Sequence, residues 1–159
     1  MAKFKYRMQN ILDIKQKLEE AAKMEFAEAN ARVLSEEEKL DSLHARRRAY
    51  EAEGKQLRKQ RMHVPDIKSN IHALDVLREL IKEQQIEVEK AKQIQEEKRL
   101  ALQNAMQERK TQEKLYENAF EEFKHEENAR EGREVDELTS YTYGVKRMAE
   151  NKHYEVEHG

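Results

Sequence analysis

Residues 57–70 read LRKQRMHVPDIKSN, and the proline in this stretch, Pro65, is the only one among the 159 residues. Pro65 has no backbone N–H for a continuing helix, and it pushes Val64 out of helical dihedral angles. Asp66 is a residue type that caps a new helix, because its carboxylate accepts hydrogen bonds from free amides of the first turn. The stretch therefore predicts a first helix that ends near position 61, a turn at about 62–66 and a second helix from about 67.

Before the break, residues of one helical stripe recur every three or four positions. The stripe runs from Phe26 to Leu57, and its upstream part consists of Met8, Ile11, Lys15, Leu18 and Ala22. Two consecutive steps of four residues, from Leu18 to Ala22 and on to Phe26, predict a stutter that locally unwinds the supercoil. The first helix is expected over about residues 4–61.

After the break, a second stripe continues without interruption from Leu74 to Phe123. Ten of its positions are apolar and five are polar. The full set of fifteen is Leu74, Leu77, Ile81, Gln84, Val88, Ala91, Gln95, Lys98, Leu102, Ala105, Arg109, Gln112, Tyr116, Ala119 and Phe123. A periodic run of this length without internal caps is typical of a coiled coil. The second helix is expected to reach about residue 140, and residues 145–159 are expected to form a flexible polar tail after Gly144.

Because only a short turn joins the two helices, they should pack antiparallel. The predicted fold is all-α: one long two-helix antiparallel coiled-coil hairpin over residues 1–144, in which Phe4 pairs with Phe123. More than half of the chain is Ala, Glu, Lys, Leu or Arg, a composition typical of long helices.

Catalysis finds little support in this composition. The chain has no cysteine, and its four glycines are isolated, so a thiol nucleophile and a glycine-rich phosphate loop are both excluded. No two histidines have the spacing that holds a metal on one helical face; residues 125–129 resemble a zinc-protease helix but carry Ala129 where the second histidine belongs. We predict a protein that is not an enzyme and needs no cofactor or metal. No secretory signal or membrane span is expected either, and the cytoplasm is the simplest location.

Charge is unevenly distributed, although the 33 acidic and 31 basic residues nearly cancel. Residues 44–61 carry a net charge of +5, with the basic residues Arg46, Arg47, Arg48, Lys55, Arg58, Lys59 and Arg61, whereas residues 113–138 carry −6. Ordinary solvated helix faces are one explanation. Two different partners, one at the hairpin tip and one at the open end, are another.

Apolar residues outside the stripe are the second sign of a partner. Val76 and Leu80 lie beside Leu77, at about the same distance from the turn as Leu43 and Tyr50 on the first helix. A two-stranded seam cannot bury all of these side chains, so either the stripe is wide or a partner covers the surplus.

Two terminal stretches resemble the FliJ family, the stalk proteins of flagellar type III export. They are FKYRMQNILDIK at 4–15, followed by LEEAAK at 18–23, and VDELTSY at 135–141. The resemblance spans roughly residues 3–144. It implies a coiled coil similar to the central stalk of rotary ATPases, whose open end binds the ring of the export ATPase and whose tip docks on the cytoplasmic domain of the membrane export gate. It also implies binding of export chaperones.

The resemblance also implies two sets of binding residues. At the export gate they are Leu43, Arg46, Tyr50, Leu77, Leu80 and Gln84. At the open end, towards the ATPase, they are Phe4, Tyr6, Arg7, Asp136, Glu137, Leu138 and Tyr141.

We therefore predict a non-enzymatic stalk and adaptor, located in the cytoplasm at the inner face of the membrane at the flagellar base, where partners hold it. One alternative is a self-associating structural scaffold, although a filament is expected to keep its repeat without a fold-back at a proline. Another is a nucleic-acid-binding hairpin, which rests on Arg46, Arg47 and Arg48 alone; it is disfavoured because interleaved aromatic residues are missing and the pI is only about 6.3.

Overall fold

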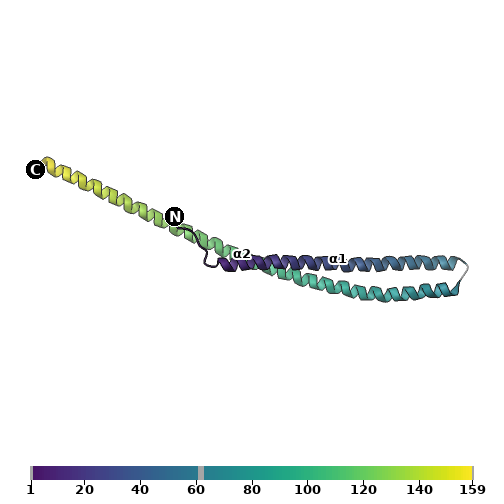
Figure 1. Ribbon diagram of the computed structural model, residues 1–159. Helices are drawn as coiled ribbons and strands as arrows, with labels where there is room; N and C mark the ends of the chain where they lie inside the picture. Colours follow the sequence, from purple (N-terminus) through teal and green to yellow (C-terminus); the bar gives the residue numbers. More distant parts are fainter. Residues whose placement is uncertain (1, 61–62, 159) are drawn as a thin grey trace. The chain divides into compact units, whose positions relative to one another are not determined.

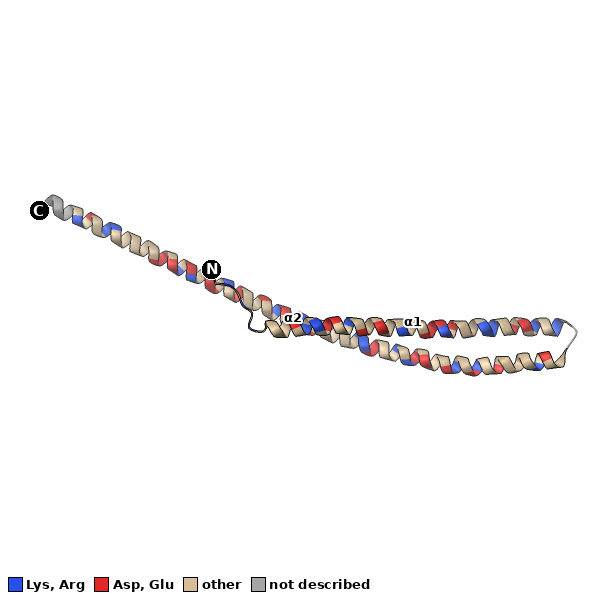
Figure 2. Ribbon diagram, viewed as in Figure 1, with Lys and Arg blue, Asp and Glu red and all other residues tan. Residues whose placement is uncertain are grey.

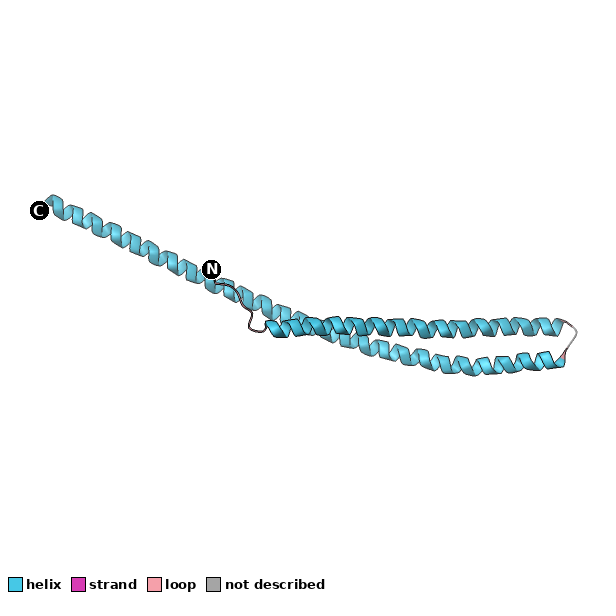
Figure 3. Cartoon of the chain, viewed as in Figure 1, coloured by secondary structure: helices cyan, strands magenta, loops and turns pink. Residues whose placement is uncertain are grey.

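The structure is a computed structural model that describes residues 2–60 and 63–158, with side chains through residue 153. It consists of two long helices, α1 (Gln9–Lys59) and α2 (Val64–His158), and the described residues contain no strand (Figures 1 and 3). The all-α hairpin predicted from the sequence is confirmed. Contacts divide the chain into a hairpin unit, Ile14–Arg109, and a terminal unit, which joins the residues up to Asp13 with those from Lys110 onward.

The hairpin unit is antiparallel, as side-chain bonds between its two helices demonstrate. The amide nitrogen of Asn70 donates to the carbonyl oxygen of Tyr50 at 2.8 Å, and that of Gln84 donates to the carbonyl oxygen of Glu36 at 2.9 Å. Further along, the Lys15 ammonium lies 2.9 Å from a Glu108 carboxylate oxygen. Residues later in α2 thus bond to residues earlier in α1, which defines an antiparallel register.

The α2 seam agrees with the sequence at every position. All fifteen predicted residues from Leu74 to Phe123 are buried or half-buried, and so are the α1 stripe positions from Phe26 to Leu57. A spacing of alternately three and four residues keeps one face of each helix turned towards its partner. The side chains on that face are therefore shielded from water along the whole seam.

The upstream part of α1 differs from the prediction. Leu12 and Glu19 are buried there, whereas Ile11 and Leu18 are exposed. The buried and half-buried positions 12, 15, 19, 22 and 26 alternate steps of three and four, so the predicted stutter was wrong. The cause is a partner on the other helix: Arg109 forms an ion pair with the Glu19 carboxylate, and Lys23 lies 3.4 Å from it, which compensates the burial of a charge.

The start of α2 also corrects the sequence analysis. The helix begins at Val64 rather than near 67, and the carbonyl oxygen of His63 accepts the first hydrogen bonds, from the amides of Asp66 at 3.1 Å and Ile67 at 3.3 Å. Pro65 sits in the first turn, where its missing N–H would have no helical partner. Asp66 is therefore not the N-cap, but its charge still favours the positive end of the helix.

The ends of the two helices lie elsewhere than predicted. At the tip, α1 ends at Lys59, and the predicted end at Arg61 and the first turn residue, Met62, lie outside the described residues. At the N-terminus, residues 4–8 are not helical, and α1 begins at Gln9. At the other end, α2 continues through Gly144 to His158, beyond the predicted end near 140 and through the predicted tail. One glycine costs a helix about 1 kcal/mol, which the good helix formers around it can outweigh.

Gly54 is the glycine for which α1 has a packing reason. A Cβ at this position would lie 2.7 Å from the side-chain oxygen of Asn70, which is itself buried and bonded to Tyr50. Gly54 therefore leaves the room in which Asn70 makes its hydrogen bond.

We expect Gly54→Ala to lower the free energy of unfolding by about 1 kcal/mol, because displacing Asn70 from its bond costs about 1–3 kcal/mol and exceeds the gain in helix propensity of about 1 kcal/mol. In an Asn70→Ala background the clash is gone, so the same change should stabilise the hairpin by about 1 kcal/mol. Urea unfolding followed by circular dichroism measures both. Equal effects in the two backgrounds would contradict the proposed contact.

Candidate functional site: two binding surfaces

An aromatic cluster joins the N-terminal residues to α2 in the terminal unit. The Phe4 ring contacts the rings of Tyr116, Phe120 and Phe123, with centroid distances of 5.5, 5.3 and 5.2 Å. Two of these contacts are edge-on, the arrangement that aromatic pairs prefer. The predicted pairing of Phe4 with Phe123 is confirmed, and Tyr116 and Phe120 join the cluster as members that the predicted binding set did not include.

Tyr6 completes the aromatic cluster through Tyr116, at a centroid distance of 5.2 Å. Residues 4 and 6 can face the same partner because the segment is non-helical; two residues apart in a helix, their side chains would point to nearly opposite sides. The hydroxyl of Tyr6 is buried and has no hydrogen-bond partner among the described residues. An unbonded buried hydroxyl carries a desolvation cost, so the ring rather than the hydroxyl holds this residue in place.

A hollow of about 570 Å³ lies beside the aromatic cluster. Its apolar part is formed by Phe4, Phe120 and Phe123, and the rest of its lining is Ala2, Lys3, Lys124, Glu127, Asn128 and Glu131. The Lys124 ammonium lies 5.6 Å from the centroid of the Phe120 ring, within the range of a cation–π interaction. An apolar side chain of a partner fits such a site, with charged groups around it to orient the partner.

The other residues of the predicted open-end set are exposed. Arg7 lies in the N-terminal segment, and Asp136, Glu137, Leu138 and Tyr141 lie on α2 beyond the aromatic cluster. The nearest of the four follows Phe123 by 13 residues, which is about 20 Å of helix. The structure thus separates the set: Phe4 and Tyr6 share the aromatic cluster, and no described contact connects them to residues 136–141.

The structure also divides the predicted export-gate set, into residues buried in the seam and residues exposed to solvent. Leu77 is only 2% exposed, and Gln84 bonds to Glu36, so both belong to the seam between the helices. Leu43 and Tyr50 are half-buried. Arg46 is exposed and Leu80 is 38% exposed; exposed Val76, which was not in the set, lies one turn before Leu80.

A basic surface occupies the last turns of α1, near this exposed apolar pair. Figure 2 shows Lys and Arg gathering towards this end of the helix. Arg47 lies 3.7 Å from Glu51, but no described carboxylate is within ion-pair distance of the exposed Arg46, Arg48, Lys55, Arg58 and Lys59. Arg61, the remaining member of the predicted basic stretch, lies outside the described residues. Unpaired cations at this density attract an acidic partner surface.

Glu36 is a buried carboxylate of the seam with three charged or polar partners. Its side chain is buried, and its oxygens lie 2.6 Å from the Gln84 amide nitrogen, 3.0 Å from Arg32 and 3.4 Å from Lys39. The Gln84 hydrogen bond lowers the pKa of Glu36 below its ordinary value of 4.5; burial opposes this, and Lys39 and Arg32 add to the lowering. For Glu19, burial alone would raise the pKa, but Arg109 and Lys23 together lower it.

These lowered pKa values predict an acid-sensitive hairpin. A carboxylate with a lower pKa in the folded chain stabilises the fold above the unfolded pKa, near 4.5, and loses that contribution as the pH falls through the folded pKa. We expect the melting temperature to hold from pH 7 to about 5 and to fall below about pH 4.5. Glu36→Gln should reduce this fall, whereas the exposed Glu38→Gln should not. An unchanged acid dependence in Glu36→Gln would show that Glu36 is not responsible.

Among the described residues, no group of three or more histidine, aspartate and glutamate side chains is arranged to hold a metal ion. In the same part of the chain, neither helix has a stretch that is long and apolar enough to cross a membrane.

Comparison with known proteins gives a family match and a structural match. The model of the flagellar FliJ protein family matches residues 4–148. A solved structure described as a YscO homolog from Chlamydia trachomatis is similar in fold, with a TM-score of 0.62 and 20% identity over 92% of this chain and 99% of that chain. No curated protein sequence matches the chain significantly. Since the family model covers all but the first three and last eleven residues, the chain belongs to the FliJ family.

Proposed function

We propose that the chain is a non-enzymatic stalk and adaptor of the flagellar type III protein export apparatus. It links the ring of the export ATPase to the cytoplasmic domain of the membrane export gate and binds export chaperones. Family membership supports an association with type III export. The protein works in the cytoplasm at the flagellar base, where its partners hold it at the membrane.

The observation that carries the proposal is the presence of two chemically different surfaces in two different units. The terminal unit offers the aromatic cluster with its hollow and an acidic helix, and the tip of the hairpin unit offers unpaired cations with Val76 and Leu80. An adaptor needs two such surfaces, whereas a scaffold built from one repeating contact does not. The proposed mechanism is coupling and recruitment without bond chemistry.

The aromatic cluster supports the ATPase as the partner of the terminal unit. Phe4 and Tyr6 are half-buried where they pack on α2, and Phe4 also lines the hollow. Partly exposed aromatic side chains next to an apolar hollow have the composition of interface hot spots. Arg7, Asp136, Glu137, Leu138 and Tyr141 are proposed to add contacts around them.

The test is binding to the purified export ATPase. Phe4→Ala with Tyr6→Ala should weaken binding at least about tenfold, because both rings leave the interface. The matched control is Phe123→Ala, which loosens the same cluster from the α2 side and leaves both N-terminal rings present. If the control loses as much affinity and melting temperature as the double variant, the rings serve only to fasten the N-terminus, and the proposed contact is wrong.

A further inference from the structure

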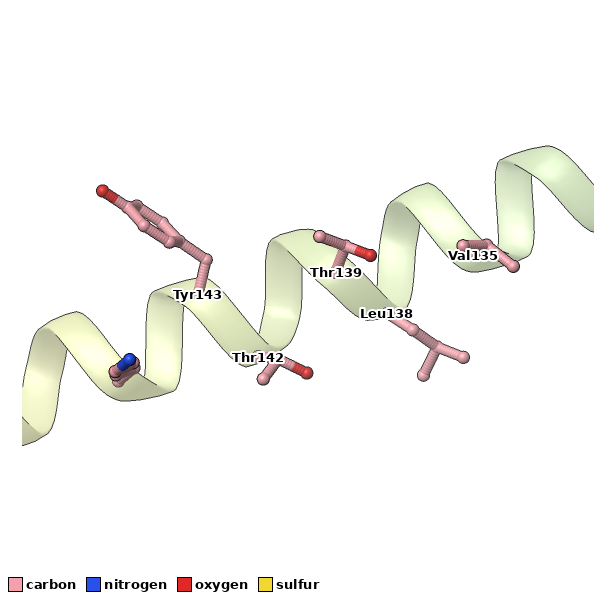
Figure 4. A pocket seen from close by; sticks show the side chains of 6 residues that line it. Val135, Leu138, Thr139, Thr142 and Tyr143 are labelled. Atoms are coloured by element: carbon pink, nitrogen blue, oxygen red, sulfur yellow. The ribbon is translucent and has the colours of Figure 1, made fainter.

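The last part of α2 carries an apolar stripe that no residue described by the structure covers. Every described residue from 128 to 153 is exposed. Within this segment Val135, Leu138, Tyr141, Val145 and Met148 follow one another at steps of three and four, so they share one side of the helix. Leu138 is 65% exposed and Met148 is 71% exposed. Figure 4 shows Leu138 and Thr142 projecting to one side and Tyr143 to the other.

The charges around this stripe change sign along the helix. Residues 131–137 carry a net charge of −3, residues 138–145 carry no charge, and residues 146–152 carry +2. Figure 2 shows this uncharged stretch between a largely acidic and a largely basic segment of α2. A parallel pair of such helices would place like charges side by side, whereas an antiparallel pair would place opposite charges together.

We propose that residues 131–153 form an antiparallel helix pair with the same segment of a second copy of this chain. With the two-fold axis between positions 141 and 142, residues equally far from the axis lie at the same level. The acidic residues 131–137 of one copy then run beside the basic residues 146–152 of the other. Glu131 and Lys152 lie on the same side of the helix as the stripe, and this register brings them to the same level. The same register places Leu138 and Val145 at one level.

A second copy fits this surface better than an arbitrary helix for a reason of symmetry. A two-fold contact requires the surface to complement itself, and the sequence reads with opposite charges in the two directions from its centre. The pair spans only about three heptads, so we expect a reversible dimer with a dissociation constant on the order of 10 μM. Leu138 and Tyr141 lie in the contact and also in the proposed ATPase-binding set, so dimer formation and ATPase binding would compete.

The experiment uses the purified chain of residues 1–159 alone, so its result does not depend on the proposed function. Sedimentation equilibrium should detect a monomer–dimer equilibrium in the wild type. Leu138→Glu with Val145→Glu should weaken it at least about tenfold, because charge replaces two apolar layers while glutamate keeps the helix. Tyr143→Glu, on the other side of the helix, should leave the constant within about threefold. Equal effects of the two variants, or a wild type that stays monomeric at about 100 μM, would overturn the proposal and leave the stripe to another partner.

Charge reversal tests the orientation. Glu131→Lys should weaken the dimer, and adding Lys152→Glu should restore it, because the antiparallel pair is then complementary again. Since the chain has no cysteine, Leu138→Cys mixed with Val145→Cys should form a disulfide-linked dimer, whereas Leu138→Cys alone should not. Efficient linkage of Leu138→Cys to itself, or failure of the Glu131→Lys, Lys152→Glu variant to dimerise, would contradict the antiparallel arrangement.

Discussion

Leu77→Ala should lower the free energy of unfolding of the hairpin by about 2–5 kcal/mol, the range for removing a buried leucine side chain. Leu77 is 2% exposed in the seam between the helices. The alanine side chain fills little of that space, and two rigid helices cannot collapse into the cavity without losing contacts on either side of it.

Leu80→Ala is the matched control, because it removes the same atoms three residues further along the same helix. Leu80 is 38% exposed, so we expect a loss below about 1 kcal/mol. Urea unfolding followed by circular dichroism measures both losses with the same slope. Equal losses would show that the seam does not run through Leu77.

Leu80→Ala with Tyr50→Ala should leave the hairpin folded, weaken binding to the cytoplasmic domain of the export gate at least about tenfold, and sharply reduce swimming. Leu80 is exposed, and the hydrogen bond that Tyr50 accepts from Asn70 uses its backbone carbonyl, which survives the substitution. The expected loss therefore comes from removed interface area rather than from unfolding.

The control for the tip double variant is Ile86→Ala with Ile94→Ala, two exposed aliphatic residues further from the tip on the same helix. Normal gate binding in both double variants would remove Leu80 and Tyr50 from the proposed surface.

Arg46→Glu with Arg48→Glu distinguishes the adaptor from the nucleic-acid-binding hairpin. An adaptor should lose mainly association rate, whereas a nucleic-acid binder should lose nearly all affinity and show a steep salt dependence. Normal motility together with lost nucleic-acid binding would favour the nucleic-acid binder.

The repeat from Leu74 to Phe123 was predicted correctly from the sequence at every position because it is redundant. Each seam residue is supported by neighbours three and four positions away, so polar members such as Gln84 and Arg109 do not obscure the period. The same reasoning failed at the start of α1. There either Ile11 and Leu18 or Leu12 and Glu19 could occupy the seam. Hydrophobicity alone favours Ile11 and Leu18, which the structure leaves exposed.

The binding surfaces were less predictable than the fold. The aromatic and basic residues could be named from composition and from the resemblance to the family. The period also places Leu77 inside the seam and Leu80 outside it, and their exposed fractions of 2% and 38% agree. Phe120 was missed, since it lies off the seam and contacts Phe4 only because the non-helical N-terminal segment packs against α2.

The sequence by itself determined two helices, the break near Pro65 and the antiparallel seam, because these depend on backbone geometry and on a period repeated over many residues. Only the tertiary structure decided that Glu19 enters the seam, since its burial requires Arg109, 90 residues away. It also decided that residues 4–8 stay non-helical, where Phe4 and Tyr6 face one aromatic cluster on α2. In both places a contact between residues distant in sequence outweighs a local preference, and such a contact exists only after the chain has folded.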